Sequence, residues 1–221
     1  FHTSLWPAEL MGVGSAFMEI FAGEEIPLIL PYDVPANQFM NLEGKKISGS
    51  RSWAVWGRDA LTRFDPDAIR YYLTVNMPES KDSDWDWAEF VARNNNELVA
   101  TWGNLANRVL AFCYKNWDGQ VPDLDIATLR PADLELLATI ENGFNTVGAE
   151  LDAVRLRSAL GEAMKLATVV NQYLDVNAPW SAIKVDKVAA SKTVYTALKA
   201  IDSLKVMFAP FLPFTCEKLH G

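Results

Sequence analysis

Residues 45–51 carry the most concentrated chemistry in the chain. This Lys-Lys-Ile-Ser-Gly-Ser-Arg segment places two ammonium groups, a guanidinium and two hydroxyls around one glycine. Backbone amides of a Gly/Ser segment can approach phosphate oxygens closely, and ammonium groups supply the opposite charge. Gly44 and Gly49 let the loop bend. The residue types therefore suit a mobile clamp for a polyphosphate, although a short basic run with serines is also typical of a solvated surface loop.

The elements that must position this segment follow from composition and periodicity. Half of the 221 residues are hydrophobic and eight are Trp, enough to fill the core of one large domain or two modest ones. This composition excludes wholesale disorder. The most apolar window, residues 10–31, is interrupted by three glutamates, so we expect no membrane span.

The two cysteines, Cys113 and Cys216, lie far apart and form no C-x-x-C pair. This usage indicates a reducing compartment and argues against a disulfide framework or a cysteine zinc site. The N-terminus is neither basic nor followed by a clean apolar run, so we predict no signal peptide. Together these features predict a cytoplasmic protein.

The formal net charge of −8 counts against nucleic-acid binding. A nucleic-acid binder usually carries a basic surface that neutralises phosphates. An acidic chain can still bind RNA if its basic groups cluster on one face, where shape and base contacts contribute more than bulk attraction.

Residues 1–42 read as mixed structure. We expect a helix over 8–18, a short strand over 26–30 and a strand over 38–42 that leads into the basic loop. Two short helices follow over 59–64 and 66–73. Asp65 stands directly before Pro66, which makes it a suitable N-cap with proline at the first helical position.

From residue 84 the pattern changes to long amphipathic helices. Apolar residues at helical spacing mark four of them: Val91, Leu98, Trp102, Leu105, Val109 and Phe112; Leu134, Leu137, Phe144, Val147 and Leu151; Leu156, Leu160, Ala163, Ala167, Val170 and Leu174; and Val194, Leu198, Ile201, Leu204 and Phe208. Ser83 or Asp84 is expected to cap the first, which runs over roughly 86–116. Four such helices with short connections predict an antiparallel bundle.

Five motifs, in a fixed order, resemble the second half of a class I methionyl-tRNA synthetase. They are Phe1-His2 with Trp6-Pro7; Asn41-Leu42-Glu43-Gly44 with Lys46-Ile47-Ser48-Gly49-Ser50; the segment 64–73; Asn104 to Arg108; and Ala178-Pro179-Trp180. The resemblance covers essentially the whole chain. It implies a mainly α protein, in which the tail of a Rossmann-type catalytic domain with a stem-contact region (1–83) precedes an antiparallel α-helical anticodon-binding bundle (84–221).

The resemblance implies roles for individual residues. The KMSKS-like loop Lys45, Lys46, Ile47, Ser48, Gly49 and Ser50 would contact ATP, Phe1 and His2 would line a methionine pocket, and Asn104, Arg108, Pro179 and Trp180 would bind the anticodon. Gly49 departs from the family, which has its second lysine there. Arg70 is a secondary RNA candidate. Independently of the resemblance, Asp67 and Arg70 are close enough to pair on a short helix, and we expect Trp53 and Trp56 to anchor the far end of the loop in the core. The alternative is structural: a terminal Phe-His pair that packs or frays, a solvated helix face and a tryptophan at the edge of the core.

The family resemblance also implies partners. Methionine, tRNA, and ATP with Mg²⁺ would be bound by the full-length enzyme, while zinc is not expected in this chain. Because the only histidines are His2 and His220, the HIGH signature of class I synthetases lies outside it. We therefore expect a C-terminal fragment that needs a missing N-terminal half and that is inactive alone.

Three other interpretations remain open from the residues. The chain can be a tRNA-binding module without catalysis, for which Gly49 is mild support. It can belong to a sister class I synthetase for isoleucine, valine, leucine or cysteine. It can also be a helical scaffold for protein contacts, which predicts no RNA binding.

Overall fold

The computed structural model describes Leu5 and residues 33–220. The predicted helix over 8–18, the predicted strand over 26–30, and the pocket residues Phe1 and His2 lie outside the described residues. The chain divides into two compact units, Phe1–Asn37 and Gln38–Gly221. The elements below all belong to the second unit.

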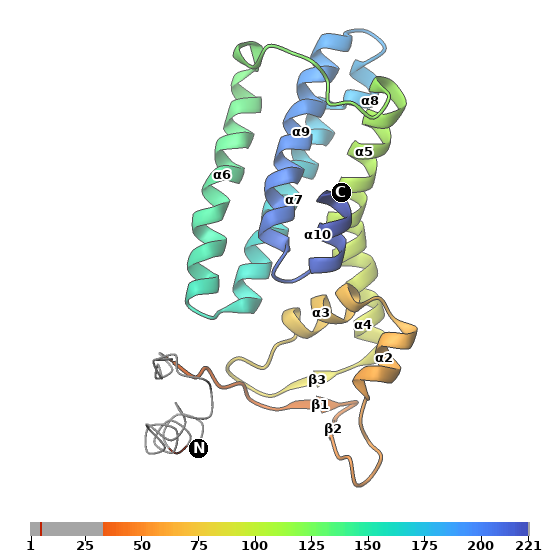
Figure 1. Cartoon of the computed structure of the whole chain (residues 1–221), viewed down its shortest axis with the longest axis vertical. Helices are drawn as coiled ribbons and strands as arrows, with labels where there is room; N and C mark the ends of the chain where they lie inside the picture. Colours follow the sequence, from red (N-terminus) through yellow and green to blue (C-terminus); the bar gives the residue numbers. More distant parts are fainter. Residues whose placement is uncertain (1–4, 6–32, 221) are drawn as a thin grey trace, which may run out of the picture. The chain divides into compact units, whose positions relative to one another are not determined.

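A small three-stranded sheet holds the basic loop (Figure 1). Its central strand is β1 (Met40–Leu42), which pairs antiparallel with β2 (Lys45–Lys46) and parallel with β3 (Ser83–Trp85). The predicted strand before the loop is therefore present. Glu43 and Gly44, with φ of 50° and 71°, make the two-residue turn between β1 and β2. Positive φ at both positions is what a type I′ hairpin turn requires.

Two short helices, α2 (Gly57–Arg63) and α3 (Pro66–Val75), connect the loop to β3. Asp65 caps α3 as predicted, because its Oδ1 accepts a hydrogen bond from the Asp67 amide at 2.8 Å. The sheet and α3 contribute to a separate, mainly aromatic cluster, whose buried members are Leu42, Tyr72, Trp85 and Phe90. This cluster fixes the base from which the loop projects.

A continuous helical stretch leads from the sheet into the bundle. It comprises α4 (Trp87–Arg93), the π-helix η1 (Asn94–Gly103) and α5 (Asn104–Trp117). The predicted single helix is thus present, but its middle is wider than an α-helix because π-type hydrogen bonds skip one more residue. This changes the phase of the buried face. Val91, predicted to face the core, is 51% exposed, and its neighbour Phe90 is buried instead.

The cap of this helical stretch also differs from the prediction. Ser83 and Asp84 lie in β3, and Asp86 is the N-cap of α4. Its Oδ1 accepts a hydrogen bond from the Glu89 amide at 2.7 Å. The chain stays extended for three residues beyond the predicted cap because β3 pairs with β1.

Three 22-residue helices complete the bundle with α5 (Figure 1): α6 (Pro131–Asp152), α7 (Leu156–Asn177) and α9 (Lys187–Phe208). Successive long helices run in opposite directions, so the predicted antiparallel bundle is confirmed. Short elements lie in two of the connections, the 3₁₀ turn η2 (Ile126–Thr128) and α8 (Pro179–Ala182), and α10 (Pro213–His220) follows α9. Leu105, Leu160, Leu174, Leu204 and Phe208 are fully buried at its centre.

The buried face of α6 is offset from the predicted one. Leu134 and Phe144 were expected in the core, but they are 51% and 37% exposed. The helix buries the predicted Val147, but its other buried residues are Asp133, Leu136, Ile140 and Gly143. A charged residue and a glycine lie on this face, and hydrophobic spacing does not identify either as core.

Asp133 is fully buried, and the hydrogen-bond network around it joins three helices. Arg130 donates to its carboxylate through Nη2 (2.6 Å) and Nε (2.9 Å), and the Tyr173 hydroxyl donates at 2.6 Å. Arg130 Nη2 also donates to Thr193 Oγ1 on α9 at 2.8 Å. Burial alone would raise the pKa of Asp133, but these hydrogen bonds outweigh it and lower the pKa. Burial and then Asp133 raise the pKa of Tyr173 to about 12.

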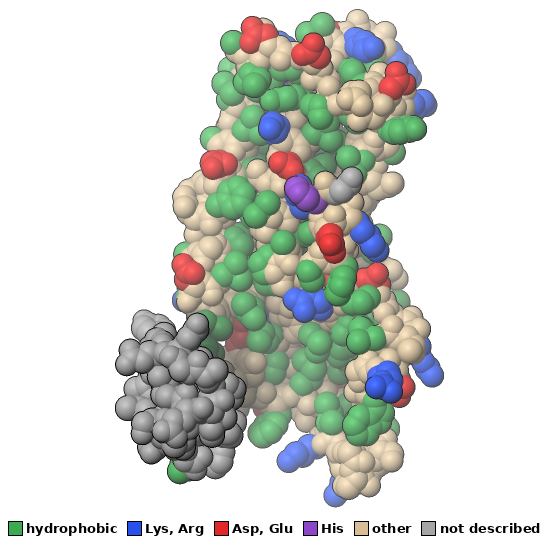
Figure 2. Space-filling view, viewed as in Figure 1, with side chains coloured by type: hydrophobic (Ala, Val, Ile, Leu, Met, Phe, Trp, Pro, Cys, Tyr) green, Lys and Arg blue, Asp and Glu red, His purple; other side chains and the backbone are tan. Residues whose placement is uncertain are grey.

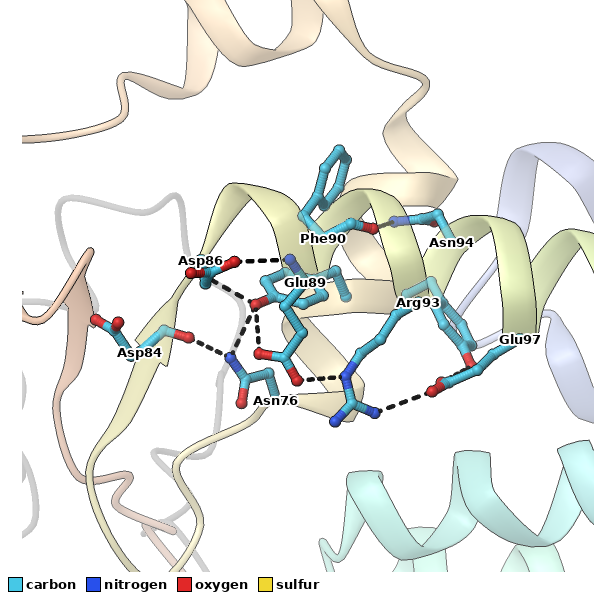
Figure 3. Close-up of polar contacts among 10 residues, drawn as sticks. Asn76, Asp84, Asp86, Glu89, Phe90, Arg93, Asn94 and Glu97 are labelled. Carbon is cyan, nitrogen blue, oxygen red and sulfur yellow. Dashed lines mark hydrogen bonds and ion pairs between the residues drawn. The ribbon is translucent and has the colours of Figure 1, made fainter.

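A second polar network ties α3 to α4 and the π-helix (Figure 3). Arg93 lies between two carboxylates, donating to Glu89 through Nε at 2.7 Å and to Glu97 through Nη1 at 3.3 Å. Tyr72 donates to Glu89 at 3.1 Å and Tyr71 to Glu97 at 2.9 Å. Burial raises the pKa of Tyr72 to about 12, so its phenol keeps the proton that it donates.

Candidate functional site

The two lysines of the loop lie on β2 and point to opposite faces of the sheet, as successive strand residues do. Lys45 Nζ lies 5.0 Å from the ring centroid of Trp53. Lys46 Nζ lies 5.5 Å from the ring of Phe39, which is itself 68% exposed. Lys46 therefore stands on the more open face. Figure 2 shows Lys and Arg side chains projecting at the end of this unit where β2 lies.

The tip of the loop is a second small hairpin. Ser48 and Trp53 exchange main-chain hydrogen bonds at 2.8 and 3.0 Å, and the Ser52 amide donates to the Gly49 carbonyl at 3.1 Å. The Ser48 and Ser50 hydroxyls lie 3.2 Å apart. Four residues, 49–52, thus form an exposed tip that presents hydroxyls and amides. A Cβ at Gly49 would meet only the Trp56 ring, at an ordinary 3.7 Å, so the site has room for a side chain.

The tryptophans after the loop behave differently from each other. Trp53 packs against the aromatic cluster and donates from Nε1 to the Leu42 carbonyl at 3.0 Å, so it anchors the loop as expected. Trp56 is 57% exposed, so the expectation that it anchors the loop in the core is wrong. Trp56 instead lines an open pocket of about 310 Å³ with α2 and Trp87.

A second group of predicted residues comes together at the other end of the bundle. The Arg108 guanidinium, on α5, lies 4.4 Å from the ring centroid of Trp180, on α8. Arg108 also contacts Asp175 Oδ1 at 3.3 Å. Asn104 is exposed one turn earlier on α5. Two segments far apart in sequence therefore build one polar and aromatic surface.

The geometry of Trp180 is set by the residues before it. Ala178 adopts φ of 36° in the left-handed region, which ends α7. Pro179 is buried and takes the first position of α8, where its fixed φ suits a helix start. The half-buried indole of Trp180 is therefore held at a sharp corner. It packs edge-on against Phe112, with ring centroids 6.4 Å apart.

Sequence reasoning missed three residues beside this surface. Asp175 pairs with Arg108, and Trp117 packs against Phe112 with centroids 5.9 Å apart. Lys187 Nζ lies 5.7 Å from the ring of Trp117. Trp117 is the last residue of α5 and Lys187 is the first residue of α9. The only sequence pattern that could have identified them was therefore a Trp and a Lys at helix boundaries. Only tertiary packing brings them beside Trp180.

One other prediction is corrected. Asp67 and Arg70 were expected to pair on α3, but each contacts the C-terminal region instead. Asp67 Oδ2 accepts from the Thr215 amide at 2.6 Å. Arg70 donates to the carbonyls of Phe211 and Pro210 at 2.9 and 2.7 Å. Arg70 thus joins α3 to the turn before α10, which weakens its candidacy for RNA.

The acidic residues before α4 act as hydrogen-bond acceptors for the backbone. Asp82 Oδ1 accepts from the Phe39 amide at 3.0 Å, and both oxygens of Asp84 accept from the Gly44 amide at 2.8 and 2.9 Å. Asp84 therefore holds the turn that begins the basic loop. Across Leu5 and 33–220, no three His, Cys, Asp or Glu side chains gather as a metal site. No helix in the same residues has the length and apolarity to cross a membrane.

Two family models together match nearly the whole chain. One, described as tRNA synthetases class I (M), matches residues 1–110. The other, the anticodon binding domain of methionyl tRNA ligase, matches residues 121–221. The chain belongs to the class I methionyl-tRNA synthetase family. The mainly α fold and the helical bundle predicted from the family resemblance are confirmed.

Individual methionyl-tRNA synthetases match over the full chain. The methionine–tRNA ligase of Roseiflexus castenholzii is 50% identical over 220 residues, which are 100% of this chain and 35% of that protein. That of Thermomicrobium roseum is 49% identical, with the same coverage. The chain therefore spans about a third of the length of the curated relatives that it matches.

A solved structure agrees. The methionyl-tRNA synthetase of Mycobacterium tuberculosis bound by methionyl-adenylate superposes with a TM-score of 0.82 at 25% identity, covering 99% of this chain and 41% of that one. These matches favour the methionyl-tRNA synthetase family over the sister class I synthetases that the sequence left open. They also disfavour a purely structural scaffold.

Proposed function

We propose that this chain is part of a methionine–tRNA ligase and that it supplies two of the enzyme's contacts. The full-length protein would join methionine to ATP and then transfer it to tRNA, in the cytoplasm. The observation that carries this proposal is the Arg108–Trp180 pair, with a 4.4 Å separation, beside the exposed Asn104. An amide, a guanidinium and an indole in one place suit unstacked bases in a single-stranded loop.

The anticodon surface would work by stacking and edge recognition. The indole of Trp180 offers a flat face, and the rigid corner at Pro179 keeps that face in place. Asn104 and Arg108 sit one helical turn apart on α5, so both can reach the edges of one base. In the free protein the Arg108 guanidinium packs on the Trp180 indole and pairs with Asp175. These two contacts would keep the surface ordered before RNA binds.

The basic loop would act on ATP. Adenylation joins the methionine carboxylate to the α-phosphate and releases pyrophosphate, on which negative charge builds. Positioned cations and amide donors stabilise that charge. Lys46 is the best-placed cation, because its ammonium stands beside exposed Phe39, while Lys45 covers Trp53. Ser48 and Ser50 would add hydroxyl and amide donors, and Mg²⁺ would enter with ATP as part of the substrate.

Binding to anticodon stem-loops tests the surface formed by Asn104, Arg108 and Trp180. We expect the protein to bind a CAU stem-loop more tightly than one with a changed anticodon. Trp180→Ala should weaken binding by about 5- to 150-fold, the loss of one stacked base at about 1–3 kcal/mol. Arg108→Ala should reduce the preference for CAU. Trp56→Ala, which removes an exposed indole at the other end, is the matched control and should bind as the wild type.

A non-catalytic tRNA-binding module is the second candidate, and Gly49 is the observation that favours it. A Cβ would fit at this position without a clash, yet the residue there in this chain has no side chain. Pyrophosphate exchange in the full-length protein separates the two. Loss of exchange in Lys46→Ala supports catalysis, and wild-type exchange in that variant supports a relic loop.

A further inference from the structure

A row of three aromatic rings with a cation at each end extends beyond the surface formed by Arg108 and Trp180. Along the row, Arg108 caps Trp180 at 4.4 Å, Trp180 meets Phe112 at 6.4 Å, Phe112 meets Trp117 at 5.9 Å, and Lys187 caps Trp117 at 5.7 Å. The row therefore holds two indoles, each with its own cation, separated by one phenyl ring. Three elements contribute to it: α5, α8 and the start of α9.

The segment between α7 and α9, with the first turns of α9, carries more basic than acidic residues within an acidic chain. Three lysines and one aspartate lie between residues 178 and 192, against a net charge of −8 for the whole protein. The aspartate, Asp186, is already engaged as the cap of α9, accepting from the Ala189 amide at 3.0 Å. Lys184 and Lys187 are exposed on either side of it. Asp118, exposed after Trp117, is the acidic residue nearest to that indole in sequence.

We propose that Trp117 and Lys187 form a second RNA contact, for a nucleotide of the single-stranded loop that flanks the anticodon. Lys187 would leave the indole and bind a backbone phosphate, and the half-buried Trp117 would pack against the ribose or base beside it. This inference rests on the proposed function, because it extends the same surface. This contact would add affinity without discriminating between bases, because an ammonium group bound to a phosphate does not contact the base.

The pairing of ring and cation is what favours single-stranded RNA as the occupant. Proteins that hold single strands combine basic groups along the backbone with aromatic faces for successive bases. Here the unit occurs twice in one row, first as Arg108 on Trp180 and then as Lys187 on Trp117. Lys187 is the first residue of α9, so the helix N-terminus adds partial positive charge at the same point.

Salt dependence of stem-loop binding tests this contact. The protein is titrated with the CAU stem-loop at several salt concentrations, as wild type, Lys187→Ala, Lys187→Gln, Trp117→Leu and Lys165→Ala. Lys165 is the matched control, an exposed lysine on α7 that pairs with Glu162 at 2.6 Å. We expect Lys187→Ala and Lys187→Gln to bind about 3- to 10-fold more weakly at low salt. Their log–log salt slope should be shallower by about 0.7, the loss of one phosphate contact on a single strand.

The preference for CAU over a changed anticodon should stay at the wild-type ratio in both Lys187 variants. Trp117→Leu should weaken binding several-fold with an unchanged salt slope. If it fails to fold, judged by its circular dichroism and melting, the two Lys187 variants alone decide the question, because Lys187 is exposed.

The outcomes separate this inference from the proposed function. If the wild type binds CAU preferentially and Lys187→Ala matches Lys165→Ala in affinity and slope, the second contact is refuted while the proposed function stands. If Lys187→Ala changes the preference for CAU, the contact is to a base and the phosphate assignment is wrong. If the wild type shows no preference, the proposed function fails, and this inference fails with it.

Discussion

Asp133 shows how one charged residue can belong to the core. Its carboxylate has no exposed surface, yet it accepts from the Arg130 amide, the Arg130 guanidinium and the Tyr173 hydroxyl. A buried charge is tolerated only when such partners replace water. The residue therefore fastens the start of α6 to α7, and through Arg130 to α9.

Asp133→Ala should destabilise the protein by about 2–4 kcal/mol, because it leaves a guanidinium and a buried phenol without their acceptor. Arg130 can partly reach water, which keeps the loss below the full penalty for an orphaned charge. Urea unfolding measures it. Glu162→Ala, which breaks the exposed pair with Lys165, is the control and should cost less than about 1 kcal/mol. An equal loss in both variants would contradict a special role for Asp133.

The same residue gives a pH dependence with a defined sign. The pKa of Asp133 is lowered in the folded protein, so the unfolded chain binds the proton more readily. Its contribution is complete above the ordinary Asp pKa of about 3.9 and is lost as the pH falls through the lower folded value. The stability advantage of wild type over Asp133→Ala should therefore shrink as the pH falls below about 4.

At the scale of elements, α6 depends on a glycine for close packing. A Cβ at Gly143 would lie 2.4 Å from Leu166 Cδ1 on α7 and 3.1 Å from Met207 Cε on α9. At Gly148, on the same helix, a Cβ would meet nothing within 4 Å. The two glycines thus share an element and differ only in what faces them.

This contrast predicts opposite responses to alanine. Gly148→Ala should stabilise the protein by about 0.5–1 kcal/mol through helix propensity. Gly143→Ala gains the same propensity but must displace the Leu166 methyl group, at a cost of about 1–3 kcal/mol. Thermal unfolding of the two variants should therefore rank Gly148→Ala above wild type and Gly143→Ala at or below it. Equal melting temperatures in the two variants would show that the helices separate easily at Gly143.

At the scale of the described unit 38–220, the two candidate sites lie at opposite ends (Figure 1). The basic loop lies at the sheet, and α8 lies at the far end of the bundle. No residue is shared between them. Between the ends stand α4, the π-helix and α5 as one continuous helical stretch, tied to α3 by the Arg93 network.

This separation predicts that the two functions can be removed independently. In the full-length protein, Lys46→Ala should lower pyrophosphate exchange by about 10²-fold, through lost stabilisation of charge on the leaving group, and should leave stem-loop affinity unchanged. Trp180→Ala should do the reverse: weaker tRNA binding with wild-type exchange. Exchange assays and stem-loop titrations on both variants check this. A loss of exchange in Trp180→Ala would reveal coupling through the helical stretch that the static contacts do not require.

The sequence by itself determined the family, the order of motifs and most of the elements. These are local properties: the cap Asp65 before Pro66 and the apolar stripe of α7 each depend on neighbours within a few residues. Such signals can be read along the chain, which is why the loop strand, the short helices and the four long helices were predicted.

Only the tertiary structure decided which side chains meet. The widening at the π-helix moved the buried face from Val91 to Phe90, and the partners Tyr173 and Arg130 made Asp133 a core residue. The row from Arg108 through Trp180 to Lys187 joins residues from three helices. Contacts of this kind depend on how distant segments pack. The spacing of residues along one helix does not indicate which side chains of other helices they will contact.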